Sequence, residues 1–303
     1  MKKHSFFYHG FIIACIFVAC HPGKMAQQTT MQSTFDKEGH RGCRGLMPEN
    51  TIPAMQKAID LNVTTLEMDA VITRDNKVVV SHDPFFNHDI TTRPDGTFID
   101  SKDEKSYNIF RMDYAEVKTF DVGLKPHPRF PRQEKVKAIK PLLADLIDSV
   151  KNYVSRKNRS LPDFNIETKS LPGTDGIFHP GPAEFVELLL GVIKEKNIME
   201  HVIIQSFDFR TLQYLHLHYP SMRTAMLIEA NDKRTMEEQV QALGFTPTIY
   251  SPAHELVSPS LVGRCHQLGI KIIPWTVDDK ERMQALIGMK VDGIITDYPD
   301  LFN

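Results

Sequence analysis

The alternation of short apolar runs with longer amphipathic runs most constrains the fold of this chain, and it begins near residue 35. The short runs are rich in β-branched residues, as strands are, whereas the longer runs have the apolar spacing of helices. The strand-like runs are 35–40, 65–72, 77–82, 163–168, 201–207, 223–229, 246–251, 270–276 and 293–296. The helix-like runs include 51–61, 142–154, 183–196, 209–219, 235–243, 259–268 and 280–289. Strands and helices in alternation predict a parallel α/β protein.

One connection breaks this alternation. Only residues 73–76 separate the second and third strand-like runs, and parallel strands cannot be joined by so short a segment. These two runs must therefore form an antiparallel hairpin, which is expected to return His82 to the level of Ala70 and Asp69. Without the returning strand there are eight parallel strands, the number that closes a TIM (β/α)8 barrel.

Two irregular stretches interrupt the predicted barrel, which spans residues 35–303. Residues 84–140 contain turn residues, a charged run and a proline-rich segment, and they are expected to form an insertion after the hairpin, near the barrel mouth. Residues 170–182 follow Lys169 and should border the same mouth. Long loops in a compact domain are usually functional, so both stretches are expected to frame a site.

Three carboxylates are expected at neighbouring strand ends. Glu67 and Asp69 are two residues apart in one strand, so their side chains leave the same face, and Glu167 ends the next parallel strand. Unpaired carboxylates on a buried face are costly, and a bound cation is the simplest relief. Carboxylate oxygens suit a hard divalent cation, Ca²⁺ or Mg²⁺, and the sequence does not choose between them.

Histidines and cations accompany these acids. His40 and His82 suit general acid–base chemistry, because imidazole titrates near neutral pH. Arg41 and Lys169 suit contacts with a phosphate group. A metal, two histidines and two cations in one place imply phosphoryl transfer.

The motifs of the chain resemble those of the glycerophosphodiester phosphodiesterase family, within the phospholipase C-like phosphodiesterases. The resemblance runs from about residue 39 to residue 301, with the motifs in the family's order. They are His40-Arg41-Gly42, Pro48-Glu49-Asn50-Thr51, Glu67-x-Asp69, His82-Asp83, Asn165-x-Glu167-x-Lys169, Ser206-Phe207-Asp208, Trp275-Thr276-Val277 and the run from Val291 to Asp297. It implies a TIM barrel with an insertion after the His-Asp motif.

The resemblance also implies a role for each matched residue. His40 and His82 would be the acid–base pair. The metal ligands would be the three carboxylates, and phosphate would contact Arg41 and Lys169. A hydroxyl of the substrate's own glycerol would attack phosphorus, and water would open the resulting cyclic phosphate. The products would be glycerol 3-phosphate and an alcohol.

Two other enzymatic or binding functions stay open. A related barrel phosphodiesterase could act on a lysophospholipid or a phosphoinositide, and an exposed apolar rim on the loops would favour it. The candidates for such a rim are Phe85, Phe86, Phe98, Phe110, Phe130 and Phe178. A non-catalytic phosphodiester-binding lipoprotein is the other alternative, but no histidine or acid of the motifs is missing.

Several residues have two interpretations. Glu49 could orient Arg41, or it could only precede Asn50 as a helix N-cap. Trp275 could stack on a choline-like cation of the substrate, or it could fill the top of the barrel.

Arg44 stands where small residues are common in the family and would add a cation near the mouth. The loop histidines His88, His127, His179 and His254 are expected at the surface, with His179 nearest to the substrate.

The N-terminus resembles a bacterial lipoprotein signal. Residues 1–19 have a basic start and an apolar run that ends before Cys20, the expected site of lipidation, and Cys15 is a weaker competing site. The polar residues 20–34 are then a tether. These features predict an exported lipoprotein that faces the periplasm. An ordinary cleaved signal, which would release a soluble exported protein, is the alternative.

Composition limits the partners. The chain carries 36 Lys and Arg residues against 38 Asp and Glu residues, a net charge of −2, which gives no electrostatic reason to expect nucleic acid. A small glycerophosphodiester is the expected partner, and membrane association is expected only through the lipid anchor. The chain after the predicted tether contains Cys43 and Cys265. One disulfide between them is possible in an oxidising compartment.

Overall fold

The computed structural model describes residues 1–7 and 35–303. The chain divides into two units, residues 1–33 and 34–303. In the first unit, residues 1–7 are exposed and have no regular secondary structure. The predicted lipidation site Cys20 and the predicted tether lie outside the described residues and stay predictions. No helix in the described part is long and apolar enough to cross a membrane.

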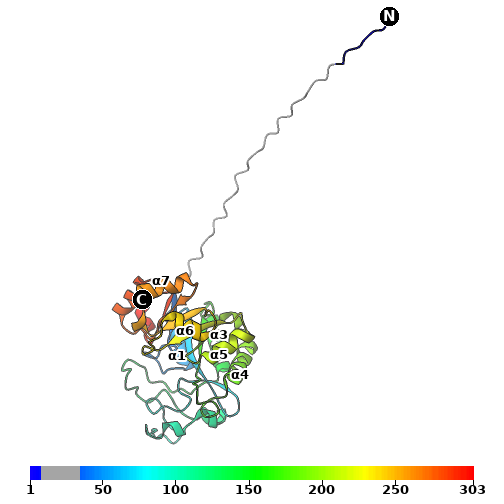
Figure 1. Cartoon of the computed structure of the whole chain (residues 1–303). Helices are drawn as coiled ribbons and strands as arrows, with labels where there is room; N and C mark the ends of the chain where they lie inside the picture. The colour runs from blue at the N-terminus through cyan, green and yellow to red at the C-terminus, as the bar shows by residue number, and fades with distance from the viewer. Residues whose placement is uncertain (8–34) are drawn as a thin grey trace. The chain divides into compact units, whose positions relative to one another are not determined.

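The second unit is a TIM-like barrel of eight parallel strands, as the alternation predicts. The parallel strands are β1 (Asp36–Gly39), β2 (Thr65–Ile72), β4 (Asp163–Thr168), β5 (Val202–Ser206), β6 (Arg223–Ile228), β7 (Ile249–Pro252), β8 (Lys271–Ile272) and β9 (Gly293–Thr296). The helices are α1 (Ile52–Asp60), α2 (Tyr114–Val117), α3 (Leu143–Arg156), α4 (Pro182–Glu195), α5 (Phe209–His218), α6 (Met236–Leu243), α7 (Pro259–Gln267) and α8 (Lys280–Gly288). Except for the short α2, these helices surround the sheet (Figure 1).

The strands are hydrogen-bonded in the order β8-β7-β6-β5-β4-β2-β1-β9. Beyond β8 the chain continues the ladder irregularly, because Pro274 has no N–H to donate. Its carbonyl accepts from the backbone N–H of Ile295 at 3.0 Å, and the carbonyl of Ile272 accepts from Asp292 at 2.9 Å. These bonds join the segment after β8 to β9 and close the barrel.

The third strand, β3 (Val78–Val80), returns antiparallel along β2. The predicted hairpin is therefore confirmed, but its register differs from the prediction. Ala70 pairs with Val80, and the N–H of Ser81 donates to the carbonyl of Asp69 at 2.9 Å. Ser81 is thus level with Asp69, and His82 lies one residue further along. The connection comprises residues 73–77, one residue more than predicted, and the N–H of Thr73 donates to the carbonyl of Lys77 at 3.0 Å across it.

Apolar side chains fill both sides of the sheet. Strand residues that point outwards pack under the helices, for example Phe164 against the layer that contains Phe185. The inward-pointing residues alternate with them, as in any barrel. A small apolar cluster fills the interior and consists of Ile203, Ala225, Ile249, Ile273 and Ile295, with Trp275 packed against it. The polar inward positions of the remaining strands are thereby left for the site.

Residues 84–140 form loops with the short helix α2 at one end of the barrel (Figure 1) and have an apolar cluster of their own. The rings of Phe86 and Phe120 stack with centroids 4.1 Å apart. Ile109 and Val117 are fully buried in the same cluster, which packs on Val79 of β3. Because this segment has its own core, the side chains that it presents to the barrel mouth are held in place.

Both body cysteines are buried and free. Cys43 donates to the carbonyl of Ala54 at 3.3 Å, and Cys265 lies in α7. The disulfide that the sequence allows between these two cysteines is not formed.

Candidate active site

A cavity of about 530 Å³ opens at the carboxyl ends of the strands. Eight of the nine predicted site residues line it: His40, Arg41, Glu49, Glu67, His82, Glu167, Lys169 and Trp275. The ninth, Asp69, does not line the cavity and is 1% exposed. Active sites of TIM barrels occupy this end of the strands, so the cavity is the candidate active site.

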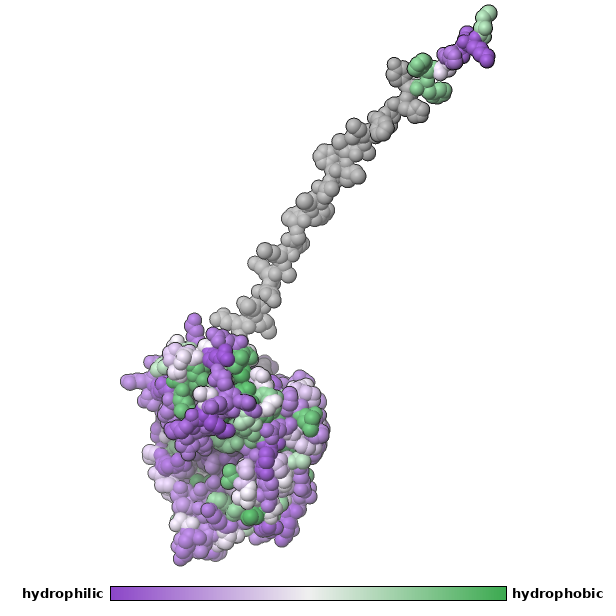
Figure 2. All heavy atoms as spheres, viewed as in Figure 1, coloured by the Kyte–Doolittle hydropathy of each residue, from purple (hydrophilic) through white to green (hydrophobic). Residues whose placement is uncertain are grey.

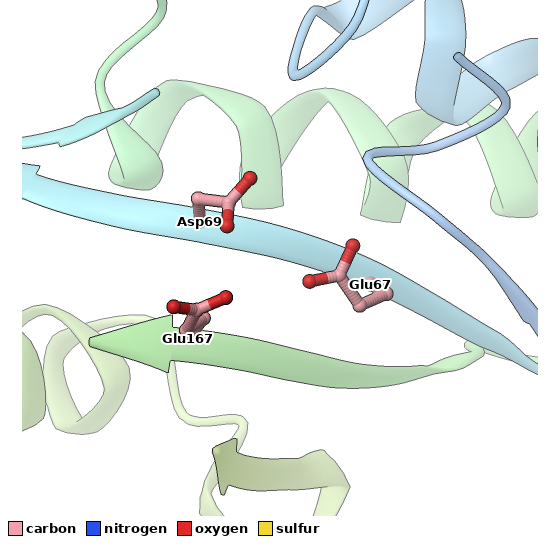
Figure 3. A group of neighbouring side chains, drawn as sticks. All are labelled: Glu67, Asp69 and Glu167. Carbon is pink, nitrogen blue, oxygen red and sulfur yellow. The ribbon is translucent and has the colours of Figure 1, made fainter. Parts of the chain in front are cut away.

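The three carboxylates converge (Figure 3). Glu67 and Asp69 come from β2, and Asp69 is paired in register with Glu167 of β4. Ligand atoms of the three groups lie within 4.8 Å of one another. Oδ1 of Asp69 is buried and has no hydrogen-bond partner in the described part of the chain. A set of buried carboxylate oxygens, one of which accepts no hydrogen bond from the described residues, fits a divalent cation of the hard type.

Each carboxylate is held by further contacts. Glu67 accepts from the backbone N–H of Arg41 and from Nε2 of Gln205, both at 2.7 Å. Asp69 accepts from Nδ2 of Asn50 at 2.7 Å. Glu167 accepts from Nζ of Lys169 at 2.7 Å. These bonds fix the orientation of the carboxylates, as supporting contacts around metal ligands do.

The pKa values of the three acids differ because their surroundings differ. Burial and the charge of Asp69 raise the pKa of Glu67 well above its ordinary value. Burial opposes ionisation of Asp69 too, but the charges of Arg41 and Lys169 hold its pKa well below its usual range. Burial raises the pKa of Glu167 to about 7. Asp69 is therefore the acid whose ionised form the protein itself stabilises most.

The two predicted phosphate-binding cations are paired with these acids. Arg41 Nη1 donates to Glu49 Oε1 at 2.9 Å, and its Nε lies 3.3 Å from Asp69 Oδ2. The contact with Glu49 is the one that an orienting role requires. The alternative role of Asn50 as a helix N-cap is wrong, because Thr51 caps α1 by accepting from the N–H of Ala54.

Each histidine is paired with an aspartate. His40 Nδ1 lies 2.6 Å from Asp297 Oδ1, and His82 Nδ1 lies 3.1 Å from Asp83 Oδ1. A carboxylate at Nδ1 favours the tautomer with its proton there and leaves Nε2 for the substrate. Burial lowers the pKa of His40 to about 4, although Asp297 opposes this shift. Burial and the nearby Arg41 charge lower the pKa of His82.

Asp297 is also bound by Arg44, a residue outside the predicted site. Arg44 Nε and Nη2 donate to the two oxygens of Asp297 at 2.9 and 2.8 Å. The guanidinium lies 4.8 Å from the centroid of the Phe130 ring, in the insertion. A two-pronged contact of this kind fixes the plane of a carboxylate, and the carboxylate in turn fixes His40.

Other lining residues escaped the sequence analysis. His127 and Arg129 line the cavity from the insertion, although His127 was expected at the surface. His179 is buried and does not line the cavity, which contradicts its expected approach to the substrate. Its Nε2 accepts from the N–H of Leu171 at 3.0 Å and its Nδ1 bonds to the carbonyl of Pro180 at 2.8 Å. Gln205 also lines the cavity, and its signal in the sequence is that of a polar residue at a strand end.

Trp275 lines the cavity and is fixed there. Its Nε1 donates to the carbonyl of Ser251 at 2.9 Å, and its ring meets Phe207 edge to face with centroids 5.4 Å apart. The side chain thus both packs on the apolar interior of the barrel and presents a face to the cavity.

Among TIM barrels, this mouth has the chemistry of a phosphoric diester hydrolase. Carboxylates suit a hard cation, oriented imidazoles suit proton transfer, and cations suit the phosphate oxygens.

The chain belongs to the glycerophosphodiester phosphodiesterase family, because residues 40–301 match the Glycerophosphoryl diester phosphodiesterase family. A glycerophosphodiester phosphodiesterase of Caldanaerobacter subterraneus subsp. tengcongensis is 32% identical over 263 residues, which cover 86% of this chain and 93% of the relative.

Solved structures show the same fold. A protein of Silicibacter pomeroyi DSS-3, assigned as a glycerophosphoryl diester phosphodiesterase, has a TM-score of 0.78 at 29% identity, covering 89% of this chain and 92% of its own. A phosphodiesterase of Oleispira antarctica, solved in complex with the product sn-glycerol-3-phosphate, has a TM-score of 0.66 at 19% identity. The latter match covers 88% of this chain and 94% of the other.

Arg44 is expected to be a positioning residue for His40. In Arg44→Met, kcat for a glycerophosphodiester should fall about 10- to 100-fold with little change in KM, because Asp297 is free to rotate and the imidazole loses its alignment. Arg44→Lys should recover part of the loss, since it keeps the charge without the two-pronged contact. Steady-state kinetics check this.

The matched control for Arg44 is Arg132→Met, which removes an exposed ion pair with Asp300 and touches no group of the site. It should leave kcat unchanged. A rise in KM at constant kcat in Arg44→Met would contradict the positioning role and indicate direct contact with substrate.

Proposed function

We propose that this enzyme hydrolyses water-soluble glycerophosphodiesters to glycerol 3-phosphate and an alcohol, with His40 and His82 as its acid–base pair. The observation that carries the proposal is that one cavity is lined by both histidines, by two of the three clustered carboxylates and by the cations Arg41 and Lys169. An aspartate holds each histidine, and the third carboxylate, Asp69, is buried beside the other two. Each of these groups suits one requirement of phosphodiester cleavage.

The first step transfers phosphorus to a hydroxyl of the substrate's own glycerol. Nε2 of one histidine takes the proton of that hydroxyl as its oxygen bonds to phosphorus. Nε2 of the other histidine donates a proton to the oxygen of the leaving alcohol as that bond breaks. The products of this step are a cyclic glycerol phosphate and the free alcohol. Arg41 and Lys169 bind the non-bridging oxygens and stabilise the charge that develops there.

The second step opens the ring with the proton transfers reversed. The histidine that gave its proton now takes one from water, whose oxygen attacks phosphorus. The other histidine returns its proton to the departing glycerol oxygen, which yields glycerol 3-phosphate. Asp297 and Asp83 hold the Nδ1–H of each ring through both steps.

Glu67, Asp69 and Glu167 would hold Ca²⁺ or Mg²⁺ beside these groups. When bound, the cation supplies polarisation of a phosphoryl oxygen and neutralises part of the transition-state charge. Gln205 and Asn50 keep two of the three carboxylates oriented for it.

The loops support a small substrate rather than a lysophospholipid. Of the six phenylalanines expected at an apolar rim, Phe86 is fully buried and Phe130 is 7% exposed. Only Phe98 is largely exposed, and Nζ of Lys125 lies 4.7 Å from its ring centroid. The face of the domain shown in Figure 2 is largely hydrophilic, with small separate apolar patches.

The test incubates the purified protein with glycerophosphocholine, glycerophosphoethanolamine, glycerophosphoinositol or lysophosphatidylcholine in the presence of Ca²⁺ or Mg²⁺. ³¹P NMR should show glycerol 3-phosphate from the three soluble diesters, preceded by a transient cyclic phosphate. Faster turnover of lysophosphatidylcholine than of every soluble diester would overturn the proposed substrate class. A lack of turnover with all four would favour the non-catalytic binding protein.

A further inference from the structure

We propose that His127 and Arg129 form a subsite that binds oxygen acceptors on the leaving alcohol, a carboxylate above all. The inference rests on the proposed function and adds a substrate class to it. Both residues come from the insertion, and both line the cavity that also contains His40 and His82. Neither contacts the carboxylates or the histidines of the predicted site.

His127 lines the cavity and can donate a hydrogen bond to a ligand there. Its Nδ1 accepts from the backbone N–H of Arg129 at 3.1 Å. A neutral imidazole that accepts at Nδ1 must carry its proton on Nε2. Burial lowers the pKa of His127 and so favours this neutral form. No partner for Nε2 is found among the described residues, which leaves this N–H available to a ligand.

Arg129 provides a cation next to this donor. Its guanidinium lies 5.3 Å from the centroid of the Phe130 ring, and no carboxylate of the described residues lies within 4.0 Å of it. The other lining cations are engaged, for example Lys169 with Glu167 at 2.7 Å. Arg129 therefore has no carboxylate partner among the described residues, and its charge is available to an anionic group on the leaving alcohol.

The segment that carries these two residues is fastened to the barrel. The His127 ring meets Phe130 edge to face with centroids 4.6 Å apart. Gln133 Nε2 donates to the carbonyl of Arg44 at 2.7 Å, and the N–H of Glu134 donates to the carbonyl of Leu46 at 2.9 Å. Because the donors are held before the substrate arrives, little conformational entropy is lost on binding.

Two further acids, Asp89 and Glu229, also line the cavity. Their influence on substrate preference must be distinguished from that of His127 and Arg129. Asp89 lies 3.2 Å from His88 Nε2, and Glu229 directly follows β6. Either could attract an ammonium group on the leaving alcohol. The informative substrates are therefore glycerophosphoserine and glycerophosphoethanolamine, which carry the same ammonium and differ by one carboxylate.

The experiment measures kcat/KM for these two substrates in the full chain with Ca²⁺ or Mg²⁺. The wild type should prefer glycerophosphoserine, because its carboxylate meets Arg129 and His127. Arg129→Met and His127→Phe should each lower the ratio of the two kcat/KM values about tenfold, the effect of losing one charge-assisted hydrogen bond. Arg132→Met, which leaves the cavity lining intact, should keep the wild-type ratio.

Thermal unfolding shows whether each variant is folded, and the ratio is read only in folded variants. Because Arg129 is exposed, its variant should fold even where the buried His127 variant does not. A wild-type ratio near one, or an unchanged ratio in Arg129→Met, would overturn the subsite while leaving the proposed function in place. No turnover of either substrate would overturn the proposed function and the subsite together.

Discussion

Replacing His40 or His82 by alanine is expected to lower kcat on glycerophosphocholine about 10²- to 10⁴-fold, with a much smaller effect on KM. Each imidazole is aligned by an aspartate at Nδ1, Asp297 for His40 and Asp83 for His82, so that Nε2 faces the cavity. Loss of either ring removes a proton transfer from the transition state and not a contact of the ground state. The measurement is steady-state turnover with glycerol 3-phosphate as the product detected.

The leaving group can separate the two roles. A diester of glycerol phosphate with p-nitrophenol needs no proton on its departing oxygen, because p-nitrophenolate is a stable anion. The variant that lacks the general acid should therefore lose far less activity on this diester than on glycerophosphocholine, while the variant that lacks the base loses both. His218→Ala, at an exposed position of α5, is the matched control. Full activity of either catalytic variant would contradict its acid–base role.

Chelation with EDTA is expected to abolish turnover, and Ca²⁺ or Mg²⁺ should restore it. Binding of the cation can also be measured independently of activity, through its effect on the thermal stability of the protein. A cation that binds only the folded state adds about 2.7 kcal/mol when present at 100 times its Kd. That stabilisation corresponds to a rise in Tm of about 5–10 °C for a domain of this size. Differential scanning fluorimetry with and without each cation measures the rise.

The rise in Tm should disappear when a ligand is lost. Asp69→Asn and Glu67→Gln keep the hydrogen-bonding shape of each side chain but remove charge from the cluster of buried carboxylates. Glu255→Gln, at an exposed position, is the control and should respond to the cation as the wild type does. A rise that persists in Asp69→Asn and Glu67→Gln would place the cation elsewhere, and turnover in EDTA would contradict its role in the reaction.

Much of the fold could be predicted because its signals are local. Alternating strand-like and helix-like runs depend on side-chain periodicity within short windows, and the short link at residues 73–76 allows only a hairpin. The details that were missed depend on backbone hydrogen bonds. Pro274 limits the regular part of β8 to Lys271–Ile272, and the bond from Thr73 to Lys77 sets the register that places Ser81 opposite Asp69.

The residues of the candidate site that end barrel strands were also predictable. Parallel strands bring their carboxyl ends to one rim, so Glu67 and Glu167 had to meet once their strands were neighbours. The contributions of the insertion were not predictable in this way. His127 lines the cavity whereas His179 is buried within its own loop, and both residues stand in irregular stretches where no period relates position to exposure.

The sequence by itself therefore determined the barrel, the three acids and the two histidines, because strand periodicity and the order of motifs fix which residues reach the rim. Only the tertiary structure decided what surrounds them. The two-pronged contact of Arg44 with Asp297 and the packing of the Arg44 guanidinium on the Phe130 ring join residues far apart in the chain. Such contacts arise from how the barrel closes and how the insertion packs against it, and no local pattern encodes either.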